Sequence, residues 1–220
     1  VRWTHEALKP QYRGWNGVTA DHTYSWHDSI HDGGANSCGL NVTAPCDDYF
    51  HGSHTIGSVD GDDHSATPAT RDQIGVAPGA KWIACRNMNA GVGTISRYVE
   101  CNDFFLAPGG DAAMQPDVVN NSWGCSVAEG CDTSTWMQIR PSIQALNAAG
   151  VMFVASAGND GGQGCGSIND PPAVYAESLS VGNFYDVTGV IAGSSSRGLR
   201  DYTNLLGPDV SAPVTSIRSA

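Results

Sequence analysis

Hydrophobic positions in the middle of the chain follow the spacing of a strand and then a helix. Residues 81–88, KWIACRNM, form a short apolar run that is typical of a buried strand. Residues 94–107 carry four apolar side chains near helical spacing, and Thr94 stands before them as a helix cap. The four are Ile95, Tyr98, Val99 and Phe105. This segment therefore predicts a strand followed by a helix.

The alternation continues toward the end of the chain. Residues 117–123, DVVNNSW, predict a second strand, and residues 151–159 and 178–184 predict a third and a fourth. Between the second and third strands, residues 133–150 predict a helix that stops at Gly150. Its apolar face consists of Trp136, Ile139, Ile143 and Leu146. Pro141 predicts either a kink in this helix or its true start.

Strands that alternate with helices predict an α/β fold with a mostly parallel sheet and helices on both faces. In such sheets ligands bind beyond the carboxyl ends of the strands. Three predicted strands are followed by small and polar residues, RNMNAGVG, SWGC and AGNDGG, so we expect these loops to converge on one edge. Residues 1–50 are rich in Gly, Asp, Asn and aromatic residues without periodicity, and they predict a long surface segment ahead of the core.

Length and composition predict one globular domain. The chain has 220 residues, of which 40% are hydrophobic, and no segment has the composition of a linker, so residues 1–220 are expected to share one core. A formal net charge of -11 argues against nucleic acid or an anionic membrane surface as partner, because phosphate groups attract Lys and Arg. No apolar run approaches the roughly 20 residues of a membrane-spanning helix.

Seven cysteines without a CxxC pair indicate disulfides, and hence a secreted, extracellular protein, more than a zinc site. Proximity along the chain suggests three pairs, Cys38 with Cys46, Cys85 with Cys101, and Cys125 with Cys131. Cys165 is then left over, either unpaired or bonded outside this chain.

A pair of histidines in HGSHTIG, residues 51–57, offers candidate chemistry. Taken alone, such a pair is most often ordinary polar structure, and metal binding or catalysis are the alternatives. Gly52 and Gly57 fit a loop that runs into a closely packed helix with His51 at its start. His54, one turn further on, is expected to point inward.

Four segments carry a resemblance to a known family. HGSHTIG, IGVAPGAKWIACR, VVNNSWG and VASAGNDG resemble the motifs of the subtilisin-like serine proteases, and they occur in that family's order. DPPAVYAESLSVGNF, SSSRG and GPDVSAP continue the resemblance, so it covers nearly the whole chain. The cysteine pattern is most similar to the secreted bacillopeptidase-F-like and Vpr-like branch. The resemblance implies a three-layer subtilisin-like α/β fold and a serine endopeptidase.

The resemblance also implies roles for individual residues. His51 matches the general base, a task that suits imidazole near neutral pH, and Asn159 matches the amide that donates to the oxyanion. Ser122, Trp123 and Gly124 match a strand that pairs with the substrate backbone, and Gly91 and Gly93 match the opposing strand. For Trp123, plain core packing is an equal alternative.

Two members of the Asp, His, Ser triad have no match in these residues. Asp47 and Asp48 lie too close to His51, because the family's acid stands well upstream in an Asp-Thr-Gly or Asp-Ser-Gly turn. No Gly-Thr-Ser-Met nucleophile motif occurs, and Pro213-Val214-Thr215 departs from the usual Pro-Gly-Val. We therefore expect an incomplete catalytic domain, a fragment whose acid and nucleophile lie outside residues 1–220 and which is inactive alone.

Two alternatives remain open at this stage. A non-catalytic relative would keep the peptide cleft without the reaction. A metal site is the other alternative, because residues 27–32, HDSIHD, place two histidines four apart. Its candidate ligands are His22, His27, His31, His51, His54 and the Asp residues among them. The chemistry of the family needs no cofactor, although structural calcium is common in it and cannot be assigned to positions here. The expected partner is an extended polypeptide substrate, and the complete protein is expected to be a monomer.

Overall fold

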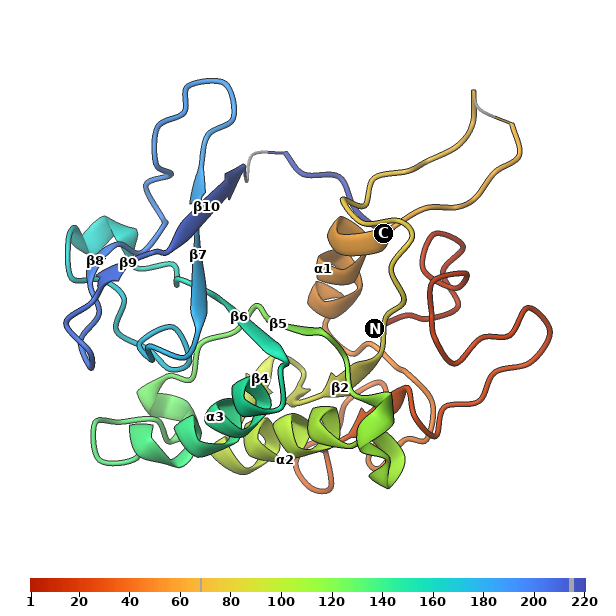
Figure 1. Cartoon of the computed structure of the whole chain (residues 1–220), viewed down its shortest axis with the longest axis horizontal. Helices are drawn as coiled ribbons and strands as arrows, with labels where there is room; N and C mark the ends of the chain where they lie inside the picture. Colours follow the sequence, from red (N-terminus) through yellow and green to blue (C-terminus); the bar gives the residue numbers. More distant parts are fainter. Residues whose placement is uncertain (68, 214–215) are drawn as a thin grey trace. The chain divides into compact units, whose positions relative to one another are not determined.

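The computed structural model describes residues 1–67, 69–213 and 216–220, and these form two compact units (Figure 1). The first unit comprises residues 1–93, 107–115 and 217–220. The second comprises residues 94–106 and 116–216. The expected departure from the family pattern at Val214 and Thr215 lies outside the described residues. The prediction of a single domain stays a prediction, and each unit is described by itself.

A parallel sheet forms the centre of the second unit. Its strands are β5 (Val118–Asn121), β6 (Met152–Ser156), β7 (Leu179–Phe184) and β10 (Val210–Pro213). They lie in the order β10-β7-β6-β5, and every neighbouring pair is parallel. The predicted strands over 117–123, 151–159 and 178–184 are therefore confirmed.

Helices α2 (Ile95–Leu106) and α3 (Arg140–Ala148) pack against each other, and α3 also packs on β6. Pro141 is the second residue of α3, so it marks the true start of that helix and does not kink it. The predicted apolar face of this segment is buried over Trp136, Ile139, Ile143 and Leu146. Trp136, the first residue of this apolar face, lies in a separate 3-10 turn, η4 (Trp136–Gln138).

The buried face of α2 differs in part from the predicted one. Tyr98 is fully buried as expected, but the other buried positions are Cys101, Asn102 and Phe104. Asn102 is accommodated there because its amide donates to the hydroxyl of Ser142 on α3 at 2.8 Å. Phe105 is only half-buried.

The first unit contains the expected helix at the histidine motif, α1 (His51–Asp60). Strand β1 (Trp26–Asp28) pairs in parallel with β2 (Ala84–Arg86). Strands β3 (Met88–Asn89) and β4 (Val92–Gly93) form an antiparallel hairpin. The remaining strands, β8 (Gly198–Leu199) and β9 (Leu206–Gly207), form a hairpin in the second unit.

The prediction that residues 1–50 form a surface segment ahead of the core is wrong. Leu8 and Tyr12 are fully buried and form a core cluster with Trp82, against which Trp3, Trp15 and other side chains pack. Trp26 and Ile30 are buried as well. The burial comes from large aromatic side chains presented by turns, which leaves no helical or strand periodicity to detect.

Two predicted disulfides are present, Cys38 with Cys46 and Cys125 with Cys131. Cys165 is free and exposed. The third pair, Cys85 with Cys101, would join residues of different units, and it stays a prediction. Within the described part of the chain, no helix is long and apolar enough to cross a membrane.

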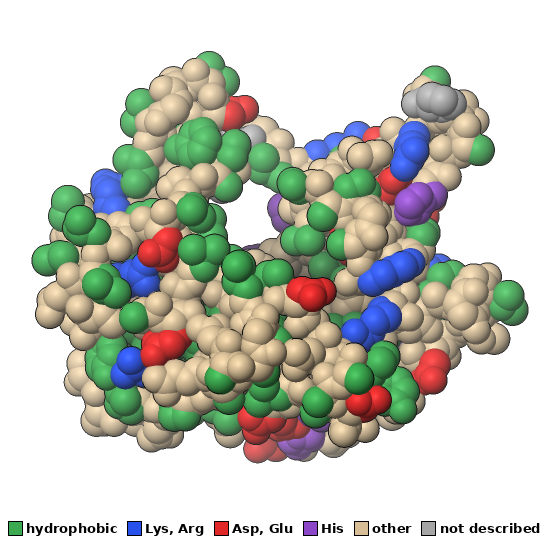
Figure 2. Space-filling view, in the orientation of Figure 1, with side chains coloured by type: hydrophobic (Ala, Val, Ile, Leu, Met, Phe, Trp, Pro, Cys, Tyr) green, Lys and Arg blue, Asp and Glu red, His purple; other side chains and the backbone are tan. Residues whose placement is uncertain are grey.

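Figure 2 draws the charged side chains on one face of the protein, with a group of acidic side chains at its lower edge. On this face, Lys and Arg side chains stand in small separate groups, with acidic side chains between them.

Candidate active site

His51 is the first residue of α1, and its side chain is exposed. Its imidazole makes no hydrogen bond or ion pair with any described residue. The helix starts here because Phe50 adopts a left-handed conformation, with φ 49°, that turns the chain into the helix. An imidazole with free ring nitrogens at a helix start is available to take up a proton.

Asp47 and Asp48 hold the loop ahead of His51 and make no bond to its imidazole. Asp47 accepts the backbone N–H groups of Tyr49 and Ser53, both at 3.0 Å, and so caps the first turn of α1. Asp48 accepts the N–H of Ala90 at 3.1 Å and lies 3.7 Å from a guanidinium nitrogen of Arg86. The acidic pair therefore has a structural role.

The expectation that His54 points inward is wrong, because its side chain is exposed. The buried positions of α1 are Ser53, Gly57 and Asp60, which follow one another at helical spacing. Gly57 packs so closely that a β-carbon there would lie 2.4 Å from the hydroxyl of Ser219. His54 lies one residue beyond Ser53 and is thus rotated away from the packed face.

Gly91 lies in the tight turn of the β3–β4 hairpin, and Gly93 ends that hairpin and is buried. Ala90 and Gly91 both have positive φ, at 49° and 87°, as a two-residue hairpin turn requires. A β-carbon on Gly91 would lie 2.8 Å from the ring of Tyr49. This position therefore needs glycine, and Tyr49 links the segment of Gly91 to the segment of His51.

Asn159 follows β6 in the second unit, and its side chain is exposed without a hydrogen bond to any described residue. Ser196, which is fully buried, holds the backbone on both sides of it. The Ser196 hydroxyl accepts the N–H of Asp160 at 2.9 Å, and the Ser196 N–H donates to the carbonyl of Gly158 at 3.1 Å. The backbone around the amide is thus fixed while the amide stays available as a donor.

Ser122, Trp123 and Gly124 continue directly from β5, next to the strand that leads to Asn159. Strands β5 and β6 pair in register from Val118 with Met152 to Asn121 with Ala155, so both segments lie at the carboxyl edge of the sheet. Gly124 is exposed and Ser122 is half-buried. The structure therefore places these two predicted parts of the site on one edge of one sheet.

Trp123 combines packing with partial exposure. Its ring stacks on that of Tyr98, with centroids 3.8 Å apart and planes 5° from parallel, and its indole N–H donates to Asn121 at 3.1 Å. Burial and the nearby Glu129 carboxylate raise the pKa of Tyr98, so its hydroxyl stays neutral and donates to Glu129 at 3.1 Å. These contacts fix the orientation of Trp123.

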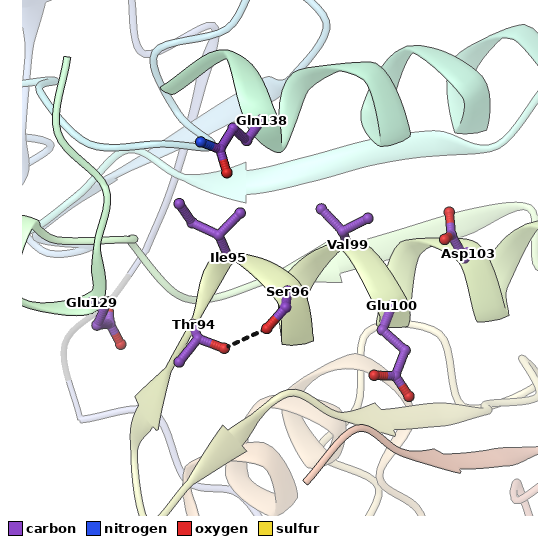
Figure 3. A pocket seen from close by; sticks show the side chains of 8 residues that line it. All are labelled: Thr94, Ile95, Ser96, Val99, Glu100, Asp103, Glu129 and Gln138. Carbon is purple, nitrogen blue, oxygen red and sulfur yellow. Dashed lines mark hydrogen bonds between the residues drawn. The ribbon is translucent and has the colours of Figure 1, made fainter. Parts of the chain in front are cut away.

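A shallow groove runs along α2 in the second unit (Figure 3). Ile95 and Val99 of α2 face Gln138 of η4 across this groove, and Asp103 lies further along the helix (Figure 3). The other lining residues are Thr94, Ser96, Glu100 and Glu129. None of the predicted site residues lines the groove, and we assign it no catalytic role.

The candidate metal ligands are not assembled into a recognisable site. Among the residues that the structure describes, no group of three or more His, Cys, Asp or Glu side chains is arranged to hold a metal ion. His22 instead shares a hydrogen bond of 2.8 Å with the hydroxyl of Tyr12 and packs edge-on against Trp3.

A parallel sheet with exposed polar groups beyond its carboxyl ends has the architecture in which α/β proteins bind ligands. A sequence model of the subtilase family matches residues 1–219. The chain therefore belongs to the subtilase family, the subtilisin-like serine proteases.

Curated relatives support the same family. Bacillopeptidase F of Bacillus subtilis (strain 168) is 36% identical over 232 residues, which cover 100% of this chain and 15% of that protein. Subtilisin DY of Bacillus licheniformis is 31% identical over 133 residues, which cover 60% of this chain and 42% of that protein. The chain thus spans less than half the length of each of these relatives.

Solved structures show the same three-layer α/β fold. S41 Psychrophilic Protease matches with a TM-score of 0.70 at 24% identity, covering 100% of this chain and 64% of that one. Sphericase matches with a TM-score of 0.62 at 21% identity, covering 97% of this chain and 74% of that one.

Two residues at the site were not found by sequence reasoning. Ser196 lies within SSSRG, which contributed only to the family resemblance, and Tyr49 lies within the loop before His51. The run of serines in SSSRG indicates polar structure around Ser196, but the sequence does not predict which segment the Ser196 hydroxyl contacts.

Proposed function

We propose that this chain is part of a secreted serine endopeptidase that hydrolyses peptide bonds in extended polypeptides. Membership of the subtilase family supports this class of activity. The two disulfides support an oxidising, extracellular setting. The chemistry uses no cofactor, and the complete protein acts as a monomer.

In this proposal His51 is the general base and Asn159 is a donor to the oxyanion. His51 takes the proton of a serine hydroxyl as the oxygen attacks the peptide carbonyl, and it later gives that proton to the leaving amine. The Asn159 amide donates to the carbonyl oxygen as negative charge develops there. The nucleophilic serine and the acid that orients His51 come from outside these 220 residues.

Two segments bind the substrate backbone in this proposal. Residues 122–124 extend the strand β5 beyond its last ladder partner, and Gly91 and Gly93 flank Val92 in the β3–β4 hairpin. Each offers backbone groups that an extended peptide can pair with as an added strand. Trp123 lies between Ser122 and Gly124, where its fixed ring borders the bound peptide.

The observation that carries the proposal is the loop of Asn159. An exposed amide without an internal partner stands between two backbone groups that a buried serine holds in place. Such an arrangement fixes the backbone from which the amide projects and leaves the amide free to donate, and an oxyanion needs such a donor.

An active-site-directed phosphonate tests the proposal. A fluorophosphonate loses fluoride when an activated serine oxygen attacks its phosphorus, so it is expected to label a chain extended at both ends to include the acid and nucleophile motifs. The 220-residue chain is expected to stay unlabelled. Labelling of the 220-residue chain at one of its own serines would contradict the assignment of the nucleophile.

The alternative is a non-catalytic relative that only binds peptides. The absence of a Gly-Thr-Ser-Met motif from these residues is the observation in its favour. Peptide hydrolysis by the extended chain excludes it, whereas peptide binding without hydrolysis supports it.

A further inference from the structure

Arg86 ends strand β2 with a buried guanidinium that lies close to two carboxylates. The residue is 6% exposed, and its Nε and Nη2 groups donate to the two carboxylate oxygens of Asp28 at 2.9 and 3.1 Å. Its Nη1 has no hydrogen-bond partner among the described residues and lies 3.7 Å from a carboxylate oxygen of Asp48. Asp28 therefore pairs with one side of the guanidinium, and Asp48 lies near the remaining nitrogen.

The guanidinium is held in place by the chain around it. The carbonyl of Arg86 accepts the N–H and the hydroxyl of Ser29 at 3.1 and 2.7 Å. The Asp28 carboxylate also accepts the N–H groups of Ile30 at 3.1 Å and Val42 at 2.7 Å. Both the backbone of Arg86 and the carboxylate that pairs with it are thus fixed, so the guanidinium is a fixed positive charge.

Asp48 joins Arg86 to the β3–β4 hairpin. The side chain of Asp48 is 6% exposed, and its carboxylate accepts the N–H of Ala90 at 3.1 Å. Ala90 and Gly91 form the turn of the hairpin, and Ala90 has φ 49°, a conformation that is costly for residues other than Gly. The carboxylate therefore holds the turn at its non-glycine residue with positive φ.

Stability alone does not explain a carboxylate at position 48. A buried ion pair is weak evidence for stability, because removing charges from water can cost as much as their attraction returns. Asp28 already pairs with Arg86 through both of its carboxylate oxygens. An apolar side chain at position 48 would avoid the cost of burial, but it could not accept the N–H of Ala90. The acceptor at this position thus serves the geometry of the turn.

The turn belongs to a segment that is proposed to bind the substrate. Asp48 stands three residues before His51, in the loop that leads into α1. The hairpin that it holds contains Val92, flanked by Gly91 and Gly93, which are proposed to pair with the substrate backbone. A shift of the turn would move this segment relative to a bound peptide, and a misplacement of about 1 Å can cost on the order of a hundredfold in rate.

We propose that Asp48, with Arg86 behind it, is a positioning residue for peptide hydrolysis, which holds the Ala90–Gly91 turn where the hairpin pairs with an extended substrate. This rests on the proposed function, since only a bound peptide makes use of the hairpin. The role depends on the hydrogen bond that the carboxylate oxygen accepts, so an amide oxygen at the same place should largely replace it.

The test compares the amide of a peptide of several residues with the amide of its last residue alone, which is too short to pair with the hairpin. Both release the same amine. In the chain extended at both ends, Asp48→Ala is expected to lower the long-to-short ratio of kcat/KM about tenfold. Asp48→Leu, which fills the space without an acceptor, should give the same fall and serves if Asp48→Ala does not fold. Asp48→Asn, which keeps an oxygen acceptor, should retain most of the ratio.

Asp62→Ala is the matched control. Asp62 is also buried in the first unit, accepts the N–H of His64 at 2.9 Å and pairs with Arg71, but none of its hydrogen bonds reaches the hairpin. This variant should leave the ratio unchanged. An unchanged ratio in Asp48→Ala, or an equal fall in Asp62→Ala, would overturn the inference. Hydrolysis of both amides by the unsubstituted extended chain would still leave the proposed function standing.

Hydrogen exchange tests the same contact apart from hydrolysis. In the 220-residue chain, the Ala90 amide is expected to exchange about tenfold faster in Asp48→Ala than in the unsubstituted chain, because it loses its acceptor. The Ala90 amide should exchange at nearly the unsubstituted rate in Asp48→Asn and Asp62→Ala. Equal exchange in Asp48→Ala and the unsubstituted chain would show that the carboxylate does not hold the turn.

Discussion

At the residue scale, the site depends on contacts that join distant parts of the sequence. Asn159 was found from its motif, but Ser196, which holds the backbone around it, lies 36 residues from Asp160 in the chain. A hydrogen bond of that kind depends on the folded sheet, and no local pattern encodes it. The sequence therefore predicts the residue proposed to contact the substrate, Asn159, better than the residue that holds its backbone, Ser196.

Ser196→Ala should lower kcat of the extended chain roughly tenfold with little change in KM. The reason is that the Asp160 N–H loses its acceptor, so the Asn159 amide is less well placed for the transition state. The loss should stay below the factor of about 10² to 10³ that removing such a donor costs in subtilisin. Steady-state kinetics measure both constants.

Ser195→Ala is the control, because the Ser195 hydroxyl is also buried and accepts a backbone N–H, that of Asn183, at 3.0 Å. It should lower stability without the effect on kcat. Faster hydrogen exchange at the Asp160 amide in Ser196→Ala alone would support the positioning role, and equal kinetic losses in both variants would refute it.

At the element scale, the sequence predicted the longer regular elements and the short strand β2 within residues 81–88, but it missed other short strands. The parallel strands β5 to β7 followed from apolar runs and turn signals, whereas Pro141 left a kink and a helix start as alternatives, of which the structure shows the start. Strand β1 has three residues, and the four residues of β10 are all exposed, so neither strand leaves a pattern of alternating burial in the sequence. The core within residues 1–50 was not predicted because its buried side chains likewise follow no periodic pattern.

Helix α1 ends on a buried carboxyl whose ionisation should weaken the first unit. Asp60 is 1% exposed, and neither of its oxygens has a hydrogen-bond partner among the described residues. Burial raises the pKa of Asp60 to about 7, against a small opposing effect of Lys81. The folded chain therefore keeps a proton that the unfolded chain releases, and stability should fall as the pH rises from about 4 to about 7.

Asp60→Asn should remove this dependence. The difference in free energy of unfolding between pH 5 and pH 8 should shrink by on the order of 2 kcal/mol, as measured by urea denaturation. Asp103→Asn, at an exposed carboxyl, serves as the control and should leave the difference unchanged. An unaltered pH dependence in Asp60→Asn would show that another group is responsible.

The disulfide between Cys125 and Cys131 closes a short loop directly after Gly124. Both cysteines are fully buried, and the Cys125 N–H donates to Pro171 at 2.7 Å. Replacing both by Ala should lower the free energy of unfolding by about 2 kcal/mol, chiefly because the unfolded chain gains freedom. Thermal denaturation measures this, and an unchanged melting temperature would contradict it.

At the scale of the whole molecule, the chain belongs to the subtilase family, and the activity of these 220 residues is a separate question. The family match covers residues 1–219, yet the chain spans only 15% of bacillopeptidase F. In the proposed function these residues supply the base and one oxyanion donor, and because catalytic triad members act as a unit, such a partial set should not give partial activity. We expect no measurable hydrolysis of an unfolded protein substrate by the 220-residue chain.

The most direct test of the proposed function is the rate at which the extended chain hydrolyses an unfolded protein substrate, measured for the unsubstituted protein and for His51→Ala. The proposed role of His51 as general base predicts ready hydrolysis that falls by about a factor of a million in His51→Ala, the loss known for the base in subtilisin. A His51→Ala variant that retains hydrolysis within tenfold of the unsubstituted protein would contradict that role.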